Sequence, residues 1–266
     1  MEQSRLGSSF VPQGNRRTVG PVEQRPSGSR GAGDVSWPTL QQRYYTGYKM
    51  GQYLRPVPGL GVIYVKNPKA GCSTILLWLD RLHTGEHDTE FSNIHNQHRL
   101  PTVGDVGRRN VMQMLQGGAY RFSFVRNPLR RFESVYWDKI VHQFRQWRPD
   151  VLTALGVDVH SEAPVSFERF LGLVEQQDPL TEMDPHWRPQ HINLLHPVVT
   201  YDHVGRLESF TQDLEQIREA AALPRVPLQT RNTSVHTGGD SVYDNRPDLV
   251  RRVERLYTTD FELYGY

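Results

Sequence analysis

The stretch VIYVKNPKAGCSTILLWL, residues 62–79, constrains the fold more than any other part of the chain. Its first four residues are apolar and mostly β-branched, which predicts a buried strand. Asn67-Pro68 then ends the strand, small residues form a tight corner, and apolar residues at helical spacing predict a helix over 73–83. A strand, small-residue loop and helix in this order aim backbone N–H groups and a helix dipole at a phosphate. The alternative is an ordinary β–α turn in which Lys69 is solvated.

A second corner of the same kind follows further along the chain. Residues 120–125, YRFSFV, alternate aromatic and β-branched side chains, which predicts a second buried strand. Arg126 comes at its carboxyl end, where α/β sheets bind ligands, and a helix is predicted from Pro128 to about residue 146. Ser134 lies in that helix and could point toward the same end. Two cations on separate corners, Lys69 and Arg126, suggest a ligand with phosphates on both ends of a nucleoside.

The rest of the chain alternates helices and strands, which predicts an α/β fold with a mainly parallel sheet. Helices are predicted over 103–116, 167–176, 187–195, 208–222 and 247–257, a third strand over 198–204, and loops over 147–164 and 224–245. Residues 37–58 are aromatic-rich and predict a short helix or arm. Residues 1–36 are rich in Gly, Ser, Pro, Gln and Arg, which predicts a disordered tail. We therefore expect one domain over 37–266.

Composition excludes several classes of protein. The 266 residues contain 31 Lys and Arg against 29 Asp and Glu, so the global basic field typical of nucleic-acid-binding proteins is missing. The single cysteine, Cys72, excludes an intramolecular disulfide and a Cys-rich zinc site, and it fits a reducing compartment. The sequence has neither an apolar run of 18 residues nor a secretory signal. We expect a soluble cytoplasmic protein without a membrane span, and the sequence leaves the oligomeric state open.

The polar segment 84–101 contains candidate proton acceptors. His95 and His98 lie three residues apart, but without a cysteine or a tight carboxylate cluster they do not favour a metal site, so no metal is predicted. A histidine held in a cleft can accept a proton near neutral pH. His186 and Glu90 stay open as alternatives for this role, although a packed, hydrogen-bonded His186 at a helix start is favoured over a catalytic one.

Both corners resemble motifs of one known family. The run PKAGCST, 68–74, is similar to the 5′-phosphosulfate-binding loop of the Golgi carbohydrate sulfotransferases of the chondroitin 4-O-sulfotransferase and HNK-1 sulfotransferase type (sulfotransferase family 2). The run FVRNPLRRFESVY, 124–136, resembles their 3′-phosphate-binding motif, with Asn127 where an acid is more usual. Later blocks follow in the family's order, so that the resemblance covers about residues 61–266: HW at 186–187, LHP at 195–197, YDHVGRLE at 201–208, LY at 256–257 and DFELYGY at 260–266.

The resemblance implies a P-loop-like α/β fold that uses 3′-phosphoadenosine 5′-phosphosulfate (PAPS) and no metal. It assigns the 5′-phosphate to the loop Pro68, Lys69, Ala70, Gly71, Cys72, Ser73 and Thr74, and the 3′-phosphate to Arg126 and Ser134. Lys69 would stabilise charge on the leaving phosphate. Since Ile94-His95-Asn96 resembles a Val-His-Asn of the chondroitin 4-O enzymes, His95 is the first candidate for the general base and His98 the second.

The expected reaction is transfer of a sulfuryl group to a hydroxyl acceptor, carried by a saccharide or glycolipid. The sequence lacks the membrane anchor, stem and cysteine pairs of the Golgi enzymes, which favours a soluble setting, with a bacterial source as one option, and argues against a glycosaminoglycan acceptor. One alternative is an ATP-dependent small-molecule kinase, which the absence of the G-x-x-x-x-G-K-[ST] pattern disfavours. The other is a non-catalytic nucleotide-binding protein.

Overall fold

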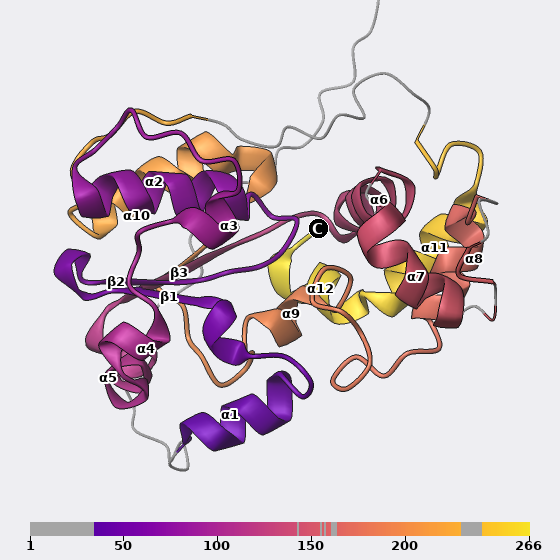
Figure 1. Cartoon of the computed structure of the whole chain (residues 1–266), viewed down its shortest axis with the longest axis horizontal. Helices are drawn as coiled ribbons and strands as arrows, with labels where there is room; N and C mark the ends of the chain where they lie inside the picture. The colour runs from indigo at the N-terminus through magenta and orange to yellow at the C-terminus, as the bar shows by residue number, and fades with distance from the viewer. Residues whose placement is uncertain (1–34, 143, 155, 157, 161–163, 230–240) are drawn as a thin grey trace, which may run out of the picture. The chain divides into compact units, whose positions relative to one another are not determined.

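One mainly parallel sheet organises the residues that this computed structural model describes, which are 35–266 apart from 143, 155, 157, 161–163 and 230–240. Within them, four strands lie in the order β1-β2-β3-β4: Leu54–Val57, Val62–Val65, Tyr120–Val125 and His203–Arg206. Strand β1 pairs antiparallel with β2, and the pairs β2–β3 and β3–β4 are parallel (Figure 1). The predicted α/β fold with a mainly parallel sheet is confirmed.

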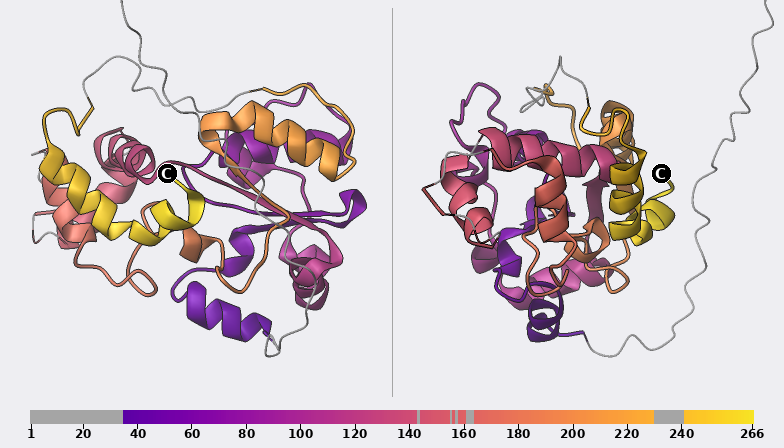
Figure 2. Two further views of the ribbon diagram at one scale, coloured as in Figure 1. Left: turned by 180° about the vertical axis from the view of Figure 1, so that it is seen from behind. Right: turned by 90° about the vertical axis from the view of Figure 1, so that its right-hand side faces the viewer.

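Helices cover both faces of the sheet because the strands are apolar on both faces. On one face, Val62 and Tyr64 pack with β3 aromatic residues against α2 (Cys72–Thr84) and α10 (Phe210–Ala220). On the other face, Ile63 and Val65 join a core with residues of α1 (Trp37–Tyr44), α4 (Val103–Val106) and α5 (Arg108–Gln113). Figures 1 and 2 show the two helical layers with the sheet between them. Successive side chains of β2 therefore point to opposite faces of the sheet, and each face packs against its own layer of helices.

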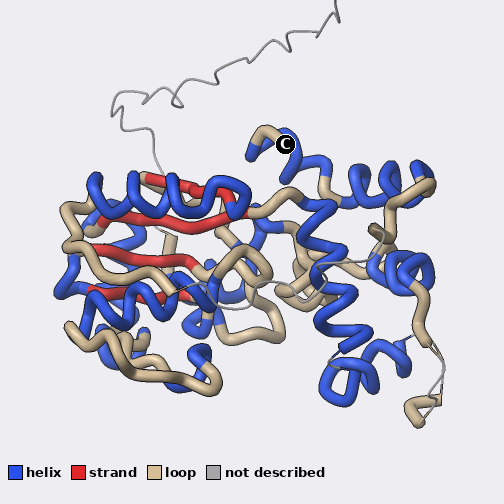
Figure 3. Tube along the Cα trace, turned by 90° about the horizontal axis from the view of Figure 1, so that it is seen from above, coloured by secondary structure: helices blue, strands red, loops and turns tan. Residues whose placement is uncertain are grey.

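A third helical group lies beyond the end of the sheet at which β3 leads into α6 (Figures 1 and 3). Its separate core is built from the apolar faces of α6 (Pro128–Val135), α8 (Phe167–Val174) and α11 (Pro247–Leu256), with residues of α7 (Phe144–Ala154). Short helices α9 (Gln190–Asn193) and α12 (Thr258–Tyr264) lie between this group and the sheet. Helices α6, α9 and α12 thus lie beyond the end of the sheet at which β3 leads into α6.

The remaining elements are short. They are α3 (Ile94–Gln97), the 3₁₀ turns η1 (Met50–Gln52), η2 (Pro58–Leu60) and η5 (Leu207–Ser209), and the π-helical turns η3 (Met114–Gly118) and η4 (Tyr136–His142). The helix predicted from Pro128 to about residue 146 is therefore interrupted by a π-helical turn. The loop predicted over 147–164 is wrong in its first part, which α7 occupies.

Other predicted elements need correction. The strand predicted over 198–204 coincides with β4 only at His203 and Val204. Val198 and Val199 donate backbone hydrogen bonds to the Leu195 carbonyl (2.8 and 3.1 Å), so they lie in a turn. The strand itself, β4, contains Gly205, where a Cβ would lie 2.6 Å from the Phe124 ring. Gly107, at φ 86°, divides the helix predicted over 103–116 into α4 and α5.

The segment before β2 is more structured than predicted. The expected short helix is α1, but β1 follows it in the same segment and was missed, because Pro56 argues against a strand anywhere except at a sheet edge. The helix predicted over 187–195 is limited to α9, since Pro189 stands at its N-terminal boundary. The predicted disordered tail lies outside the described residues except for Val35 and Ser36, and the Ser36 hydroxyl caps α1 by accepting from the Thr39 N–H (3.4 Å).

Candidate active site

The loop between β2 and α2 presents a helix N-terminus toward the site. Gly71 has φ 81°, and a Cβ there would lie 3.0 Å from Leu207 Cδ1 and 3.1 Å from Phe210 Cε2, so both conformation and packing require glycine. The N-cap residue of α2 is Gly71 itself, which has no side chain to cap this end of the helix. The first N–H groups of a helix have no intrahelical acceptor, and the helix dipole makes this end positive. The loop therefore has the properties of an anion-binding corner.

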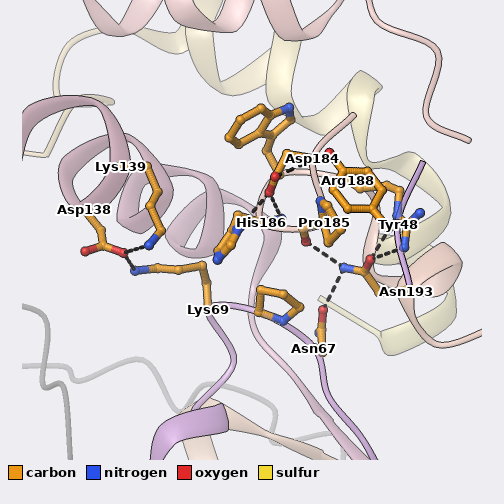
Figure 4. Close-up of polar contacts among 12 residues, drawn as sticks. Tyr48, Asn67, Lys69, Asp138, Lys139, Asp184, Pro185, His186, Arg188 and Asn193 are labelled. Carbon is orange, nitrogen blue, oxygen red and sulfur yellow. Dashed lines mark hydrogen bonds and ion pairs between the residues drawn. The ribbon is translucent and has the colours of Figure 1, made fainter. Parts of the chain in front are cut away.

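Lys69 adds charge to this corner from a strained position, with φ 69°. Its Nζ lies 2.9 Å from Asp138 Oδ2, and Lys139 Nζ lies 3.3 Å from the same oxygen (Figure 4). Burial lowers the pKa of Lys69, and the Asp138 carboxylate opposes this shift. The group carries two ammonium charges against one carboxylate, so an anion bound here would be favoured electrostatically. Asp138 and Lys139 were missed in the sequence; their spacing after Ser134, about one helical turn, was the available signal.

Arg126 forms the second corner, at the end of β3. Its backbone N–H donates to Gln190 Oε1 (3.0 Å), and its carbonyl accepts from Gln190 Nε2 (2.8 Å). Its partly buried guanidinium makes no hydrogen bond or ion pair with any residue that the structure describes. Burial lowers its pKa, which Glu208 and Glu133 oppose from a distance. A desolvated guanidinium without a partner is suited to a phosphate. Ser134 is buried in α6, the helix that follows this corner.

A buried amide network joins the two corners. Asn67, just after β2, donates to the Phe124 carbonyl (3.0 Å) and to Gln190 Oε1 (2.8 Å). Because Gln190 also binds the Arg126 backbone, the loop carrying Lys69 and the loop carrying Arg126 share one hydrogen-bonded support. Their separation is therefore fixed before any ligand arrives.

His95 lies against the first loop. Its Nε2 is 3.0 Å from Ser73 Oγ and 3.9 Å from Cys72 Sγ. Burial lowers its pKa to about 3, and the positive charges of Lys66 and of other neighbouring groups add to the shift. The structure thus brings His95 to the loop, as the resemblance implies, although its role as a base stays a prediction.

The contacts of His98 do not favour a role in proton transfer. Arg55 Nε donates to its Nε2 (3.1 Å), so the nitrogen that carries the lone pair already accepts a hydrogen bond. Its Nδ1 is buried and finds no hydrogen-bond partner in the described part of the chain. Burial first, and then the Arg55 charge, lower the pKa of His98 to about 4. This arrangement anchors β1 to the segment after α3.

A histidine–carboxylate pair on the segment before α9 completes the site. His186 Nδ1 lies 2.6 Å from Asp184 Oδ1, and the same oxygen accepts from the His186 backbone N–H (2.8 Å). Tyr48 Oη donates to Asp184 Oδ2 (3.4 Å). Figure 4 shows the His186 ring close to Lys69. Sequence reasoning treated His186 as structural and did not weigh Asp184, although their i, i+2 spacing on a loop was the signal for a local side-chain–backbone motif.

By sequence, Arg188 and Arg231 could each contact an anion or be solvated or structural. Arg188 is fully buried, donates to Asn193 Oδ1 (2.9 and 2.7 Å) and the Tyr44 carbonyl, and stacks on Tyr45, so its role is structural. Arg231 lies outside the described residues.

Among the described residues, no helix has the length and apolar character needed to cross a membrane. Within the same part of the chain, no group of three or more His, Cys, Asp or Glu side chains is placed to hold a metal ion.

A sequence model of the sulfotransferase family matches residues 57–266. Mouse carbohydrate sulfotransferase 12 is 28% identical over 246 residues, covering 77% of this chain and 58% of that protein. Human carbohydrate sulfotransferase 8 is 27% identical over 178 residues (62% and 41%), and human carbohydrate sulfotransferase 14 is 26% identical over 221 residues (77% and 57%). The chain thus spans about half the length of these relatives. No solved structure matches it significantly.

Proposed function

This chain belongs to the sulfotransferase family, and from its site we propose that it transfers a sulfuryl group from PAPS to a hydroxyl group of a saccharide or glycolipid. The observation that carries the proposal is the pair of cationic corners at the carboxyl ends of β2 and β3, joined by Asn67 and Gln190. Parallel neighbours lie about 4.8 Å apart, so one nucleotide can reach both corners. The names of the relatives support a carbohydrate acceptor.

The residues present fit PAPS. The α2 N-terminus and Lys69 would hold the 5′-phosphosulfate, and the partly buried Arg126 guanidinium, with Ser134, would hold the 3′-phosphate. When bound, PAPS supplies the sulfuryl group, and adenosine 3′,5′-bisphosphate (PAP) is the leaving group. Lys69 would neutralise charge that develops on the 5′-phosphate during transfer, and the rigid loop would supply N–H donors that need no reorganisation. An incoming anion would compete with Asp138 for Lys69.

Nucleotide binding gives the direct test. We expect PAP at 100 times its Kd to stabilise the protein by about 2.7 kcal/mol, which raises Tm by roughly 5–10 °C. Mg²⁺–ATP, which the kinase alternative requires, should shift Tm far less at the same concentration. Transfer of labelled sulfate from PAPS to desulfated chondroitin, a neutral oligosaccharide and a glycolipid then tests the reaction. Preference for Mg²⁺–ATP, or no binding of either nucleotide, would contradict the proposal.

Arg126→Ala tests the 3′-phosphate site. We expect the variant to bind PAP about 10–100-fold more weakly, since it loses charge-assisted hydrogen bonds to phosphate. Adenosine 5′-phosphate lacks the 3′-phosphate and should bind wild type and variant alike, so the preference for PAP should disappear. Arg130→Ala is the matched control, because the Arg130 side chain is 63% exposed. Isothermal titration measures the affinity of each protein for both nucleotides. An Arg126→Ala protein that keeps the wild-type preference for PAP removes Arg126 from this role.

A further inference from the structure

The Asp184–His186 pair has a defined tautomer. A carboxylate can only accept a hydrogen bond, so the 2.6 Å contact requires the proton on His186 Nδ1. In the neutral ring the lone pair then resides on Nε2. Asp184 is itself fixed, because it also accepts from the His186 N–H and from Tyr48 Oη. The side chain of His186 remains 23% exposed, so a ligand can reach it. The pair has the orientation of a base supported by a carboxylate.

Two side chains, those of Arg131 and Asn193, hold this pair beside the phosphate loop. The buried Arg131 guanidinium donates from Nε to the Pro68 carbonyl and from Nη2 to the Pro185 carbonyl, both at 3.0 Å. Asn193 Nδ2 donates to the Pro185 carbonyl (2.9 Å) and to Asn67 Oδ1 (3.2 Å) (Figure 4). Pro68 directly precedes Lys69, and Pro185 directly precedes His186. The base-like histidine and the loop lysine are therefore positioned by the same supports.

His95, the other histidine of the site, has a different environment. Its Nε2 faces Ser73 Oγ, and no carboxylate contacts its ring among the described residues. Burial lowers its pKa to about 3, and the positive charges of Lys66 and Arg55 add to the shift. A group with so low a pKa is a weak proton acceptor near neutral pH. Its hydrogen bond to Ser73 instead orders the loop.

We propose that His186 is the general base of the transfer reaction and that Asp184 is its positioning residue; this inference rests on the proposed function. As the acceptor oxygen forms its bond to sulfur, its proton passes to His186 Nε2. The electron pair of the S–O bond that breaks stays on the 5′-phosphate oxygen, next to Lys69. His95 is then a residue that organises the loop, which is a different assignment from the one implied by the family resemblance.

The pH dependence follows from the charges around the ring. Burial, together with Lys139 of η4 and Lys69 of the loop, lowers the pKa of His186, while Asp184, which Tyr48 also contacts, raises it; His95 adds a further charge only when protonated. A base acts when neutral, so kcat should fall as pH falls through this pKa, below 6.5. Asp184→Asn removes the group that raises the pKa, so the acidic limb should move to lower pH.

Kinetics of variants test the assignment. We expect His186→Ala to lower kcat about 100- to 10,000-fold, with PAP affinity within threefold of wild type and partial rescue by added imidazole. His95→Asn should cost less than tenfold, and the exposed His87→Ala is the control. The acceptor in these assays is the saccharide of the panel that wild type sulfates fastest. If none is sulfated, water is the acceptor and the release of PAP is measured. The inference is overturned if kcat of His186→Ala stays within threefold of wild type, or if His95→Asn lowers kcat more than His186→Ala does.

A measurement without donor or acceptor keeps the test independent of turnover and of the variants' folding. ¹⁵N spectra of the histidine rings in the wild-type protein should show His186 as the Nδ1–H tautomer at pH 7, and an Nε2–H tautomer would overturn the assignment. If wild type binds PAP and transfers sulfate while His186→Ala does so equally, only the base assignment fails. If wild type neither binds PAP nor turns over PAPS, the proposed function fails, and the base assignment with it.

Discussion

Replacing Lys69 with alanine is expected to lower kcat for sulfuryl transfer about 100- to 1,000-fold, the cost of removing a preorganised donor from developing negative charge. The fold should survive, because Asp138 keeps Lys139 as a partner, with Nζ 3.3 Å from the same oxygen, when Lys69 is removed. PAP affinity should fall less than kcat, since Lys139 and the α2 N-terminus remain at the same corner. The effect is thus concentrated in the transition state.

Steady-state kinetics with labelled PAPS, together with PAP titration, separate the two effects. Lys49→Ala is the matched control because Lys49 is exposed and lies outside the site. Lys69→Arg should recover part of the rate by keeping the charge, although a guanidinium fork differs in shape from an ammonium. A Lys69→Ala enzyme whose kcat stays within threefold of wild type would show that the leaving phosphate is stabilised by other groups.

Arg131→Met should cost about 3–5 kcal/mol of unfolding free energy. Arg131 is 2% exposed and donates to the carbonyls of Pro68, Pro185 and Arg188, at 2.9–3.0 Å. Methionine fills similar space but removes the donor to the buried Pro68 and Arg188 carbonyls, while the Pro185 carbonyl keeps only Asn193 Nδ2 (2.9 Å). Each buried acceptor left unsatisfied costs about 1–3 kcal/mol. Since the same bonds join the phosphate loop to the segment carrying His186, we expect lost activity as well as lost stability.

Urea unfolding at constant pH measures this effect from the shift in midpoint. The neighbouring Arg130→Met is the control: its side chain is 63% exposed and its pairing with Glu133 spans 3.4 Å, so a change below about 1 kcal/mol is expected. An Arg131→Met protein within 1 kcal/mol of wild type would mean that water replaces the lost donors, and that the guanidinium does not fix the loop.

Local sequence predicted the two strand–loop–helix corners well because each is a continuous segment of the chain. The residues 62–65 and 120–125 are strands as expected, and the helix predicted over 73–83 is α2, Cys72–Thr84. Gly71 shows why: its φ and its contacts with Leu207 and Phe210 both need glycine, so the sequence records the geometry. Elements whose pattern has another cause were mistaken, as at Val198 and Val199, which are apolar because a turn is buried.

Sequence alone determined the α/β class, the loop with Lys69, the corner with Arg126 and the family, since these depend on neighbours in the chain. The tertiary structure decided which distant groups complete the site. It pairs Lys69 with Asp138, lets Arg55 donate a hydrogen bond to His98 Nε2, and places the Asp184–His186 pair beside the loop. These contacts join residues from about 40 to more than 100 positions apart, and periodicity carries no information about them. Buried polar groups such as Arg131 select them, because each must find a partner.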